Sequence, residues 1–151
     1  MGGTPRGVLT GRDLIVVLGW HCRLSSVDNE LAEYWHLRFE LLSRALGLPP
    51  DWHEDHARTP RMISVLAPSV LSEGFFSGFL EYTPLPGEMT IMKRHMPHIE
   101  AAEANLRERL LDYGEALLLE FWPEVRGKVI DEDQLVVAGL PPLQPDPVDY
   151  M

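Results

Sequence analysis

The chain has 151 residues, 45% of them hydrophobic, and its 23 Asp and Glu against 13 Lys and Arg give a formal net charge of −10. This composition predicts one domain with its own core, and no apolar run reaches the roughly 18 residues that a membrane-spanning helix needs. So acidic a chain, with only Lys93 and Lys128 as lysines, is disfavoured as a ligand of nucleic acid or of an anionic membrane, because like charges repel.

Cysteine usage and the N-terminal residues predict a cytoplasmic protein. Cys22 is the single cysteine, so an internal disulfide is excluded. The first residues do not show the charged segment and apolar stretch of a secretory signal. Residues 1–12 are rich in glycine, and we expect them to be flexible.

A strand and then a helix are expected after this segment. Residues 14–19 (LIVVLG) are apolar and partly β-branched, a pattern typical of a short buried strand. Ser25 and Asp28 supply helix N-cap chemistry, and Gly47 can end a helix. We therefore predict a helix over residues 27–46.

The apolar side chains of this predicted helix spread over an arc of roughly 200°, which is more than a helix at the surface of a domain needs. Arg38 projects from the middle of the arc. An unpaired buried charge is very costly, so Arg38 must find a carboxylate, extend its charged end to solvent, or form an anion site. We favour a structural ion pair.

The middle of the chain predicts a loop and three strands. Residues 51–61 are polar and indicate a loop, and residues 61–67 (RMISVLA) are typical of a second strand. Residues 74–82 and 88–93 are strand-like as well. The TPLPG sequence of residues 83–87 places proline and glycine where a hairpin turn needs them.

A long helix is predicted over residues 98–122, between Pro97, which suits a first helical turn, and Pro123, which ends it. One side of this helix carries an apolar stripe within about 100°, which predicts a core-facing surface. Residues 134–138 (QLVVA) would form the last strand. Residues 140–151 are rich in proline and should form an extended tail.

This order of elements predicts an α+β fold. We expect a single domain over residues 13–139, in which a small, mostly antiparallel sheet is packed by two long helices. An open sheet edge, or the back of the long helix, would also favour a homodimer.

The opposite side of the long helix carries a second apolar stripe, with glutamates interleaved over an arc of roughly 80°. Either another layer of the protein covers this side, or it is a surface for a partner. As a surface it would present an aromatic anchor within an acidic rim, which suits a basic partner. The partner-binding residues predicted in this way are Glu100, Glu108, Leu111, Glu115, Leu118 and Trp122.

No catalytic motif is found, and no cofactor is predicted. The sequence lacks a GxSxG nucleophile motif and the glycine-rich phosphate loops GxxxxGK[ST] and GxGxxG. His53 and His56 have an HxxH spacing, but they lie in the expected loop without the helical geometry of an HExxH zinc motif, so they are weak candidates for metal ligands. Cys22 follows the expected strand, where a partly buried, inert thiol is the usual outcome.

The beginning of the chain has the pattern of a known family. The pattern is an apolar helix bearing Glu and Arg, framed by Gly19-Trp20, Arg23, Ser25, Ser26 and Trp52. Over residues 15–53 it resembles the start of an immunity-protein family from bacterial polymorphic toxin systems. The resemblance implies a small acidic α+β protein that binds a cognate toxin, often a nuclease, and blocks it.

We therefore expect a non-enzymatic immunity or inhibitor protein that neutralises a basic toxin through the acidic, partly apolar face of the long helix. Direct binding to nucleic acid or to a membrane is not expected. The first alternative is a homodimeric assembly protein in which the second stripe is the self-contact. The second is a small enzyme with a histidine or carboxylate site, and with a metal ion.

Overall fold

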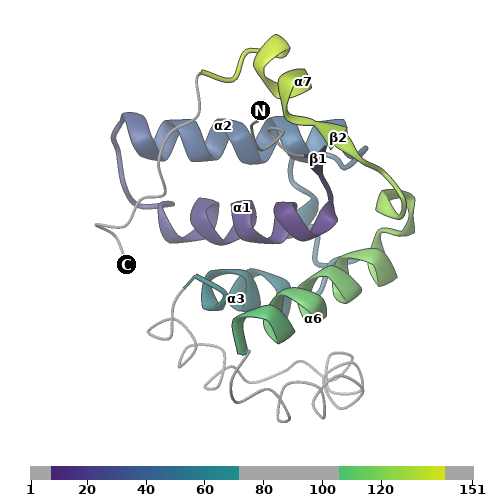
Figure 1. The fold of residues 1–151 in the computed structure, drawn as a ribbon. Helices are drawn as coiled ribbons and strands as arrows, with labels where there is room; N and C mark the ends of the chain where they lie inside the picture. Colours follow the sequence, from purple (N-terminus) through teal and green to yellow (C-terminus); the bar gives the residue numbers. More distant parts are fainter. Residues whose placement is uncertain (1–7, 72–105, 142–151) are drawn as a thin grey trace.

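The computed structural model describes residues 8–71 and 106–141, and this part of the chain is mainly helical (Figure 1). None of its helices is long and apolar enough to cross a membrane. The α-helices are α1 (Gly11–Arg23), α2 (Glu30–Ala45), α3 (Met62–Ser69), α6 (Leu106–Phe121) and α7 (Glu132–Val137). The remaining elements are the 3-10 helices η1 (Trp52–Glu54) and η2 (Pro123–Val125) and the antiparallel strands β1 (Val8–Leu9) and β2 (Ile130–Asp131).

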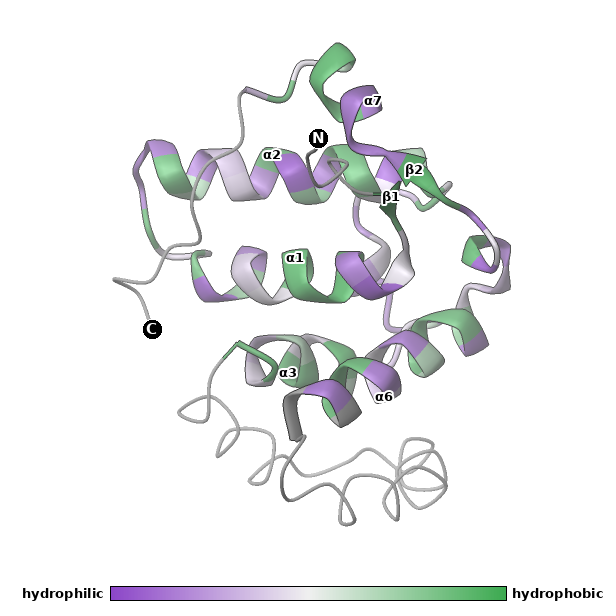
Figure 2. Ribbon diagram, in the orientation of Figure 1, coloured by the Kyte–Doolittle hydropathy of each residue, from purple (hydrophilic) through white to green (hydrophobic). Residues whose placement is uncertain are grey.

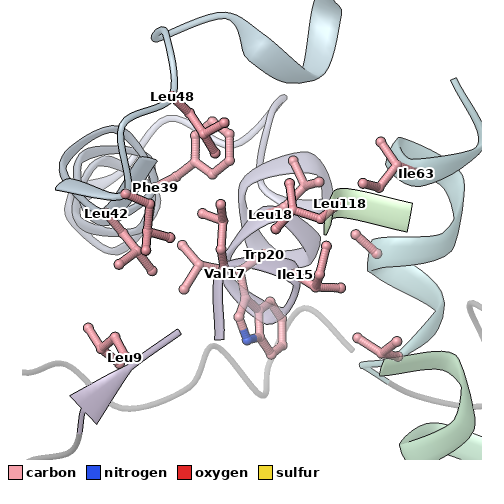
Figure 3. Close-up of a cluster of buried hydrophobic side chains, with 14 of the residues drawn as sticks. Leu9, Ile15, Val17, Leu18, Trp20, Phe39, Leu42, Leu48, Ile63 and Leu118 are labelled. Atoms are coloured by element: carbon pink, nitrogen blue, oxygen red, sulfur yellow. The ribbon is translucent and has the colours of Figure 1, made fainter. Parts of the chain in front are cut away.

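Helix α1 lies at the centre of the fold. It contacts α2 on one side and α3 and α6 on the other (Figure 1). Hydrophobic residues occupy the middle of α1 (Figure 2), and Leu14, Ile15 and Leu18 are fully buried. In the core, Phe39 of α2 and Ile63 of α3 lie on opposite sides of α1 (Figure 3).

The predicted α+β fold is wrong, because the expected strands within the described residues are helical. Residues 14–19 lie in α1, whose first turn is held by the Thr10 amide, which donates to Asp13 Oδ2 at 2.8 Å. An uninterrupted apolar run suits a helix covered on both sides as well as it suits a buried strand. The fold also includes residues 8–12, which were expected to be flexible.

Residues 61–67, expected to form a strand, lie almost entirely in α3. The side chains that they bury follow a helical period, at Met62, Ile63, Leu66 and Ala67. This spacing corresponds to one face of a helix and differs from the alternation of a strand.

The last expected strand, residues 134–138, falls largely in α7. Asp131 caps this helix, and its amide donates to Gln134 Oε1 at 2.8 Å. The expected hairpin of residues 74–93 and the first part of the predicted long helix, residues 98–105, lie outside the described residues. In the described part, α1 is central, and the β-structure consists of the two-residue strands β1 and β2.

The first predicted helix is confirmed, with boundaries moved by a few residues. The N-cap is Asn29 and not the predicted Ser25 or Asp28. The Asn29 side chain accepts a hydrogen bond from the Ala32 amide at 2.9 Å. Gly47, with a φ of 89°, follows its last turn, as expected of a glycine that ends a helix. The ion pair expected for Arg38 is also confirmed, because its guanidinium pairs with Glu132 and joins α2 to α7.

Two glycines allow α1 and its neighbours to approach closely. A Cβ at Gly19 would lie 2.5 Å from the carbonyl oxygen of Ala67 in α3. A Cβ at Gly114 of α6 would lie 2.9 Å from Cγ2 of Ile15 in α1. The close packing of α1 against α3 and α6 therefore requires that these two positions have no side chain.

Candidate functional site

The apolar part of the predicted partner face is covered. Leu111, Leu118 and Trp122 are 6%, 0% and 4% exposed and belong to the core. The prediction that they form anchors for a partner is therefore wrong. Of the two alternatives that the sequence left open, coverage by another layer of the protein is the correct one.

The segment around η1 covers Trp122. The indole Nε1 of Trp122 donates to Thr59 Oγ1 at 2.8 Å, and the guanidinium carbon of Arg58 lies 3.6 Å from the centre of the Trp122 ring. The rings of Trp52 and Trp122 meet edge to face, with 6.5 Å between their centroids. The residues expected to form a polar loop thus pack against the C-terminal end of α6.

The three glutamates of the predicted partner face are Glu100, Glu108 and Glu115, and the two that the structure describes differ in their surroundings. Glu108 is exposed and, together with Asp112, pairs with Arg12 of α1. Glu115 is half-buried, and Glu100 lies outside the described residues. Glu108 therefore attaches α6 to α1 in addition to facing solvent.

Three histidines gather where α1, α2 and η1 meet. The Nδ1 atoms of His21 and His36 are 2.8 Å apart. The His21 ring stacks on Phe39, with 4.3 Å between centroids, and meets His53 edge to face at 5.3 Å. Burial, followed by the proximity of His36 and His53, lowers the pKa of His21 to about 4. His21 is therefore neutral at pH 7 and packs as an aromatic ring.

The described residues do not unite the metal candidates His53 and His56 in one site. His53 is buried, which lowers its pKa, whereas His56 is exposed. Within residues 8–71 and 106–141, no group of three or more His, Cys, Asp or Glu side chains is arranged to hold a metal ion. Burial, with a contribution from Glu54, raises the pKa of the Cys22 thiol to about 11, so little nucleophilic thiolate exists at neutral pH.

A groove with an acidic rim lies along α2, and sequence reasoning did not identify it. Its volume is about 340 Å³. We call it the α2 groove, and its lining residues are Glu30, Leu31, Glu33, Tyr34, Leu37 and Pro141.

Helical spacing places most of this lining. Leu31, Tyr34 and Leu37 recur every three residues, so they share one side of α2 and form its apolar part. Pro141, which follows α7 in the chain, completes the lining. The sequence feature that could have indicated this groove is the broad apolar arc of α2, because Leu31 and Leu37 of that arc line it.

The carboxylates of the α2 groove have no internal counter-ion. Glu30 and Glu33 are exposed, and their side chains have no hydrogen-bond or ion-pair partner in the described part of the chain. Of the arginines on α2, Arg38 pairs with Glu132 and Arg44 pairs with Glu40. The lining contains no basic side chain. The groove is therefore suited to a cation that carries an apolar stem.

Comparison of the chain with protein-family models, with curated proteins and with solved structures found no match in any of the three. These comparisons neither support nor oppose the resemblance of residues 15–53 to an immunity-protein family.

Proposed function

We propose that this chain is an immunity-type inhibitor that binds a basic cognate toxin and neutralises it. The observation that carries the proposal is a difference between the two signs of charge: several arginines are paired within the protein, whereas several exposed carboxylates are not. Four basic side chains of the described residues are neutralised within the protein, because Arg12, Arg38, Arg44 and Arg58 each pair with a carboxylate. The acidic side chains are in excess, so several of them face solvent alone.

In the described residues, exposed carboxylates without an ion-pair partner lie in the first turn of α2, just before α2, and on either side of η1. In the described part of the chain they include Asp28, Glu30, Glu33, Asp51 and Asp55. Together with the net charge of −10, such a surface raises the rate of association with a basic protein and repels polyanions. An inhibitor of a nuclease would need this charge, because the nuclease cleft must be basic to bind its own substrate.

The test is co-purification of the untagged chain from its native host at moderate salt, with identification of the protein that is retained. We expect a basic protein encoded beside this chain, whose toxic activity is abolished by an equimolar amount of the chain. Because opposite charges steer the encounter, the association rate should fall about 10-fold or more from low to high salt. A retained protein that is acidic, or a basic one whose activity is unaffected, would refute the proposal.

A homodimeric assembly protein is the second candidate, and exposed valines favour it. Val8, Val129 and Val137 are 58%, 56% and 89% exposed. Val8 lies on the outward side of the two-stranded sheet, because the paired Leu9 and Ile130 are buried on the other side. Sedimentation tests this candidate: a dimer that Val129→Asp dissociates would support it, and a monomer at all concentrations would exclude it.

A further inference from the structure

We propose that the α2 groove is the part of this protein that receives an arginine side chain of a basic partner. The inference rests on the proposed function and adds to it a location and a chemical group. It also replaces the face of the long helix that the sequence indicated, whose apolar members are buried.

The groove is large enough to receive one long side chain. Its volume of about 340 Å³ lies at the lower end of the range of about 300–1,000 Å³ that is typical of small-ligand sites. Leu31, Leu37 and Pro141 supply apolar surface for the methylenes of an arginine. Tyr34 belongs to the core and is 4% exposed, so it forms the floor of the groove and leaves the contact with the guanidinium to the rim.

The rim supplies the matching charges. Glu30 and Glu33 are three residues apart in α2, so their carboxylates lie on the same side of the helix. A guanidinium has five N–H donors in a fixed plane and can serve two carboxylates, whereas the ammonium of lysine is more strongly hydrated. The apolar stem and the forked head of arginine therefore fit this lining better than the side chain of lysine does.

Two structural features bear on the strength of this attraction. Glu30 and Glu33 lie in the first turn of α2, where negative charge also stabilises the helix dipole. That role accounts for their charge but not for an apolar groove beside them. Arg38 is the cation that contacts the lining, with Nη1 3.4 Å from Tyr34 Oη, and its charge is balanced by Glu132.

A divalent metal ion is a poorer occupant than an organic cation. Calcium takes about six to eight oxygen ligands, and magnesium requires octahedral oxygen coordination. The lining provides two carboxylates and one phenol among apolar side chains. We therefore assign the groove to an organic cation, and calcium serves as a competing probe in the experiment.

The experiment is an NMR titration of the isotope-labelled chain with N-acetyl-arginine amide at low salt. Its matched control ligand is N-acetyl-citrulline amide, which has the same shape but a neutral urea in place of the guanidinium. We expect the arginine ligand to shift amide signals of residues 30–37 and of Leu140, and the citrulline ligand to leave them unchanged. Equal responses to the two ligands, shifts confined to other elements, or a response to calcium alone would overturn the proposal.

Variants make the assignment specific. The double variant Glu30→Gln with Glu33→Gln should weaken arginine binding about 5- to 10-fold, because two screened charge-assisted contacts are lost. Asp51→Asn with Asp55→Asn removes the same net charge from the two ends of η1 and should leave binding unchanged. Leu37→Arg, which places a guanidinium in the groove from within, should abolish binding of the ligand. An equal loss in both double variants would show that net charge, rather than the groove, governs binding.

Measuring the affinity of the chain for the isolated toxin tests the proposed groove independently of the proposed inhibitor function. A toxin that binds and is inhibited equally well by the wild type and by the Glu30→Gln and Glu33→Gln variant would refute the groove and leave the inhibitor function standing. Specific arginine binding in the groove, without any basic protein that the chain inhibits, would retain the cation site and refute the inhibitor function.

Discussion

The indole of Trp122 donates a hydrogen bond to the hydroxyl of Thr59 at 2.8 Å, and both side chains are buried. The same hydroxyl donates to the carbonyl oxygen of Trp52 at 2.6 Å. Thr59 thus satisfies two buried polar groups from separate parts of the chain, next to the end of α6. This contact explains why Trp122, which the sequence indicated as an anchor for a partner, instead packs in the core.

Thr59→Val should destabilise the protein although it changes the volume little. It leaves the Trp122 indole N–H without a partner in the core, and the Trp52 carbonyl keeps only the Asp55 amide at 3.4 Å as a donor. An unsatisfied buried group of this kind costs about 1–3 kcal/mol. Urea unfolding measures the loss. Thr59→Ser keeps the hydroxyl and should retain most of the stability, so an equal loss in both variants would contradict the role assigned to the hydroxyl.

Gly19→Ala should cost more than Gly114→Ala. The new methyl at residue 19 meets a backbone oxygen of α3 at 2.5 Å, and a backbone atom can move away only if the helices separate. At residue 114 it meets a side-chain methyl of Ile15, which can move more easily. Because Ala gains up to about 1 kcal/mol of helix propensity over Gly, we expect a net loss of about 1–3 kcal/mol for Gly19→Ala and near neutrality for Gly114→Ala. Thermal unfolding of the two variants decides the order.

Glu132→Gln should loosen α7. The side chains of Arg38 and Glu132 are 8% and 13% exposed, so removal of the carboxylate leaves a nearly buried guanidinium without a counter-ion. We expect a loss of about 2–4 kcal/mol and faster hydrogen exchange in α7. The exposed pair Arg44–Glu40 is the control, and Glu40→Gln should cost less than about 0.5 kcal/mol. Unchanged exchange in α7 would show that Leu135 and its neighbours hold this helix without the ion pair.

The histidine cluster should make the protein less stable in mild acid. His21 titrates near 6.5 when unfolded and near 4 when folded, so protons bind the unfolded chain more strongly between these two values. The free energy of unfolding should therefore fall as the pH decreases from about 6.5 to about 4, by about 1–2 kcal/mol after allowance for partial exposure of the ring.

One variant tests the origin of this pH dependence. His21→Gln should reduce the slope of unfolding free energy against pH, although His53, whose pKa is also lowered, keeps part of it. A slope that persists unchanged in His21→Gln would show that His21 is not its source and would leave His53 as the candidate.

The sequence predicted the amphipathic elements with clear ends better than the short apolar ones. Helix α2 has a glycine after its last turn, a capping residue before its first and a long apolar arc, and the prediction is confirmed. Residues 14–19 and 61–67 are short runs that fit a strand or a buried helix equally well, since the burial of both sides is a property of the tertiary structure. The capping pair Thr10–Asp13 was the local feature that favoured the helix.

The candidate site was harder to predict than the fold. The second stripe of the long helix looked like a surface because its covering layer, around Thr59, is distant in the sequence. The α2 groove was not visible for the same reason, because Pro141 comes close to Leu31 and Leu37 only through the path of α7. By contrast, the buried position of Arg38 made an ion pair predictable, while its partner Glu132 was not.

The central position of α1 also has a consequence for folding during synthesis on the ribosome. Helix α1 is complete at Arg23, yet α6, which covers part of it, ends at Phe121. At ordinary rates of translation those roughly 100 residues take about 5–20 s to synthesise. During this interval Ile15 lacks its neighbour Gly114, so the nascent chain presents an apolar surface that a chaperone can bind before the fold closes.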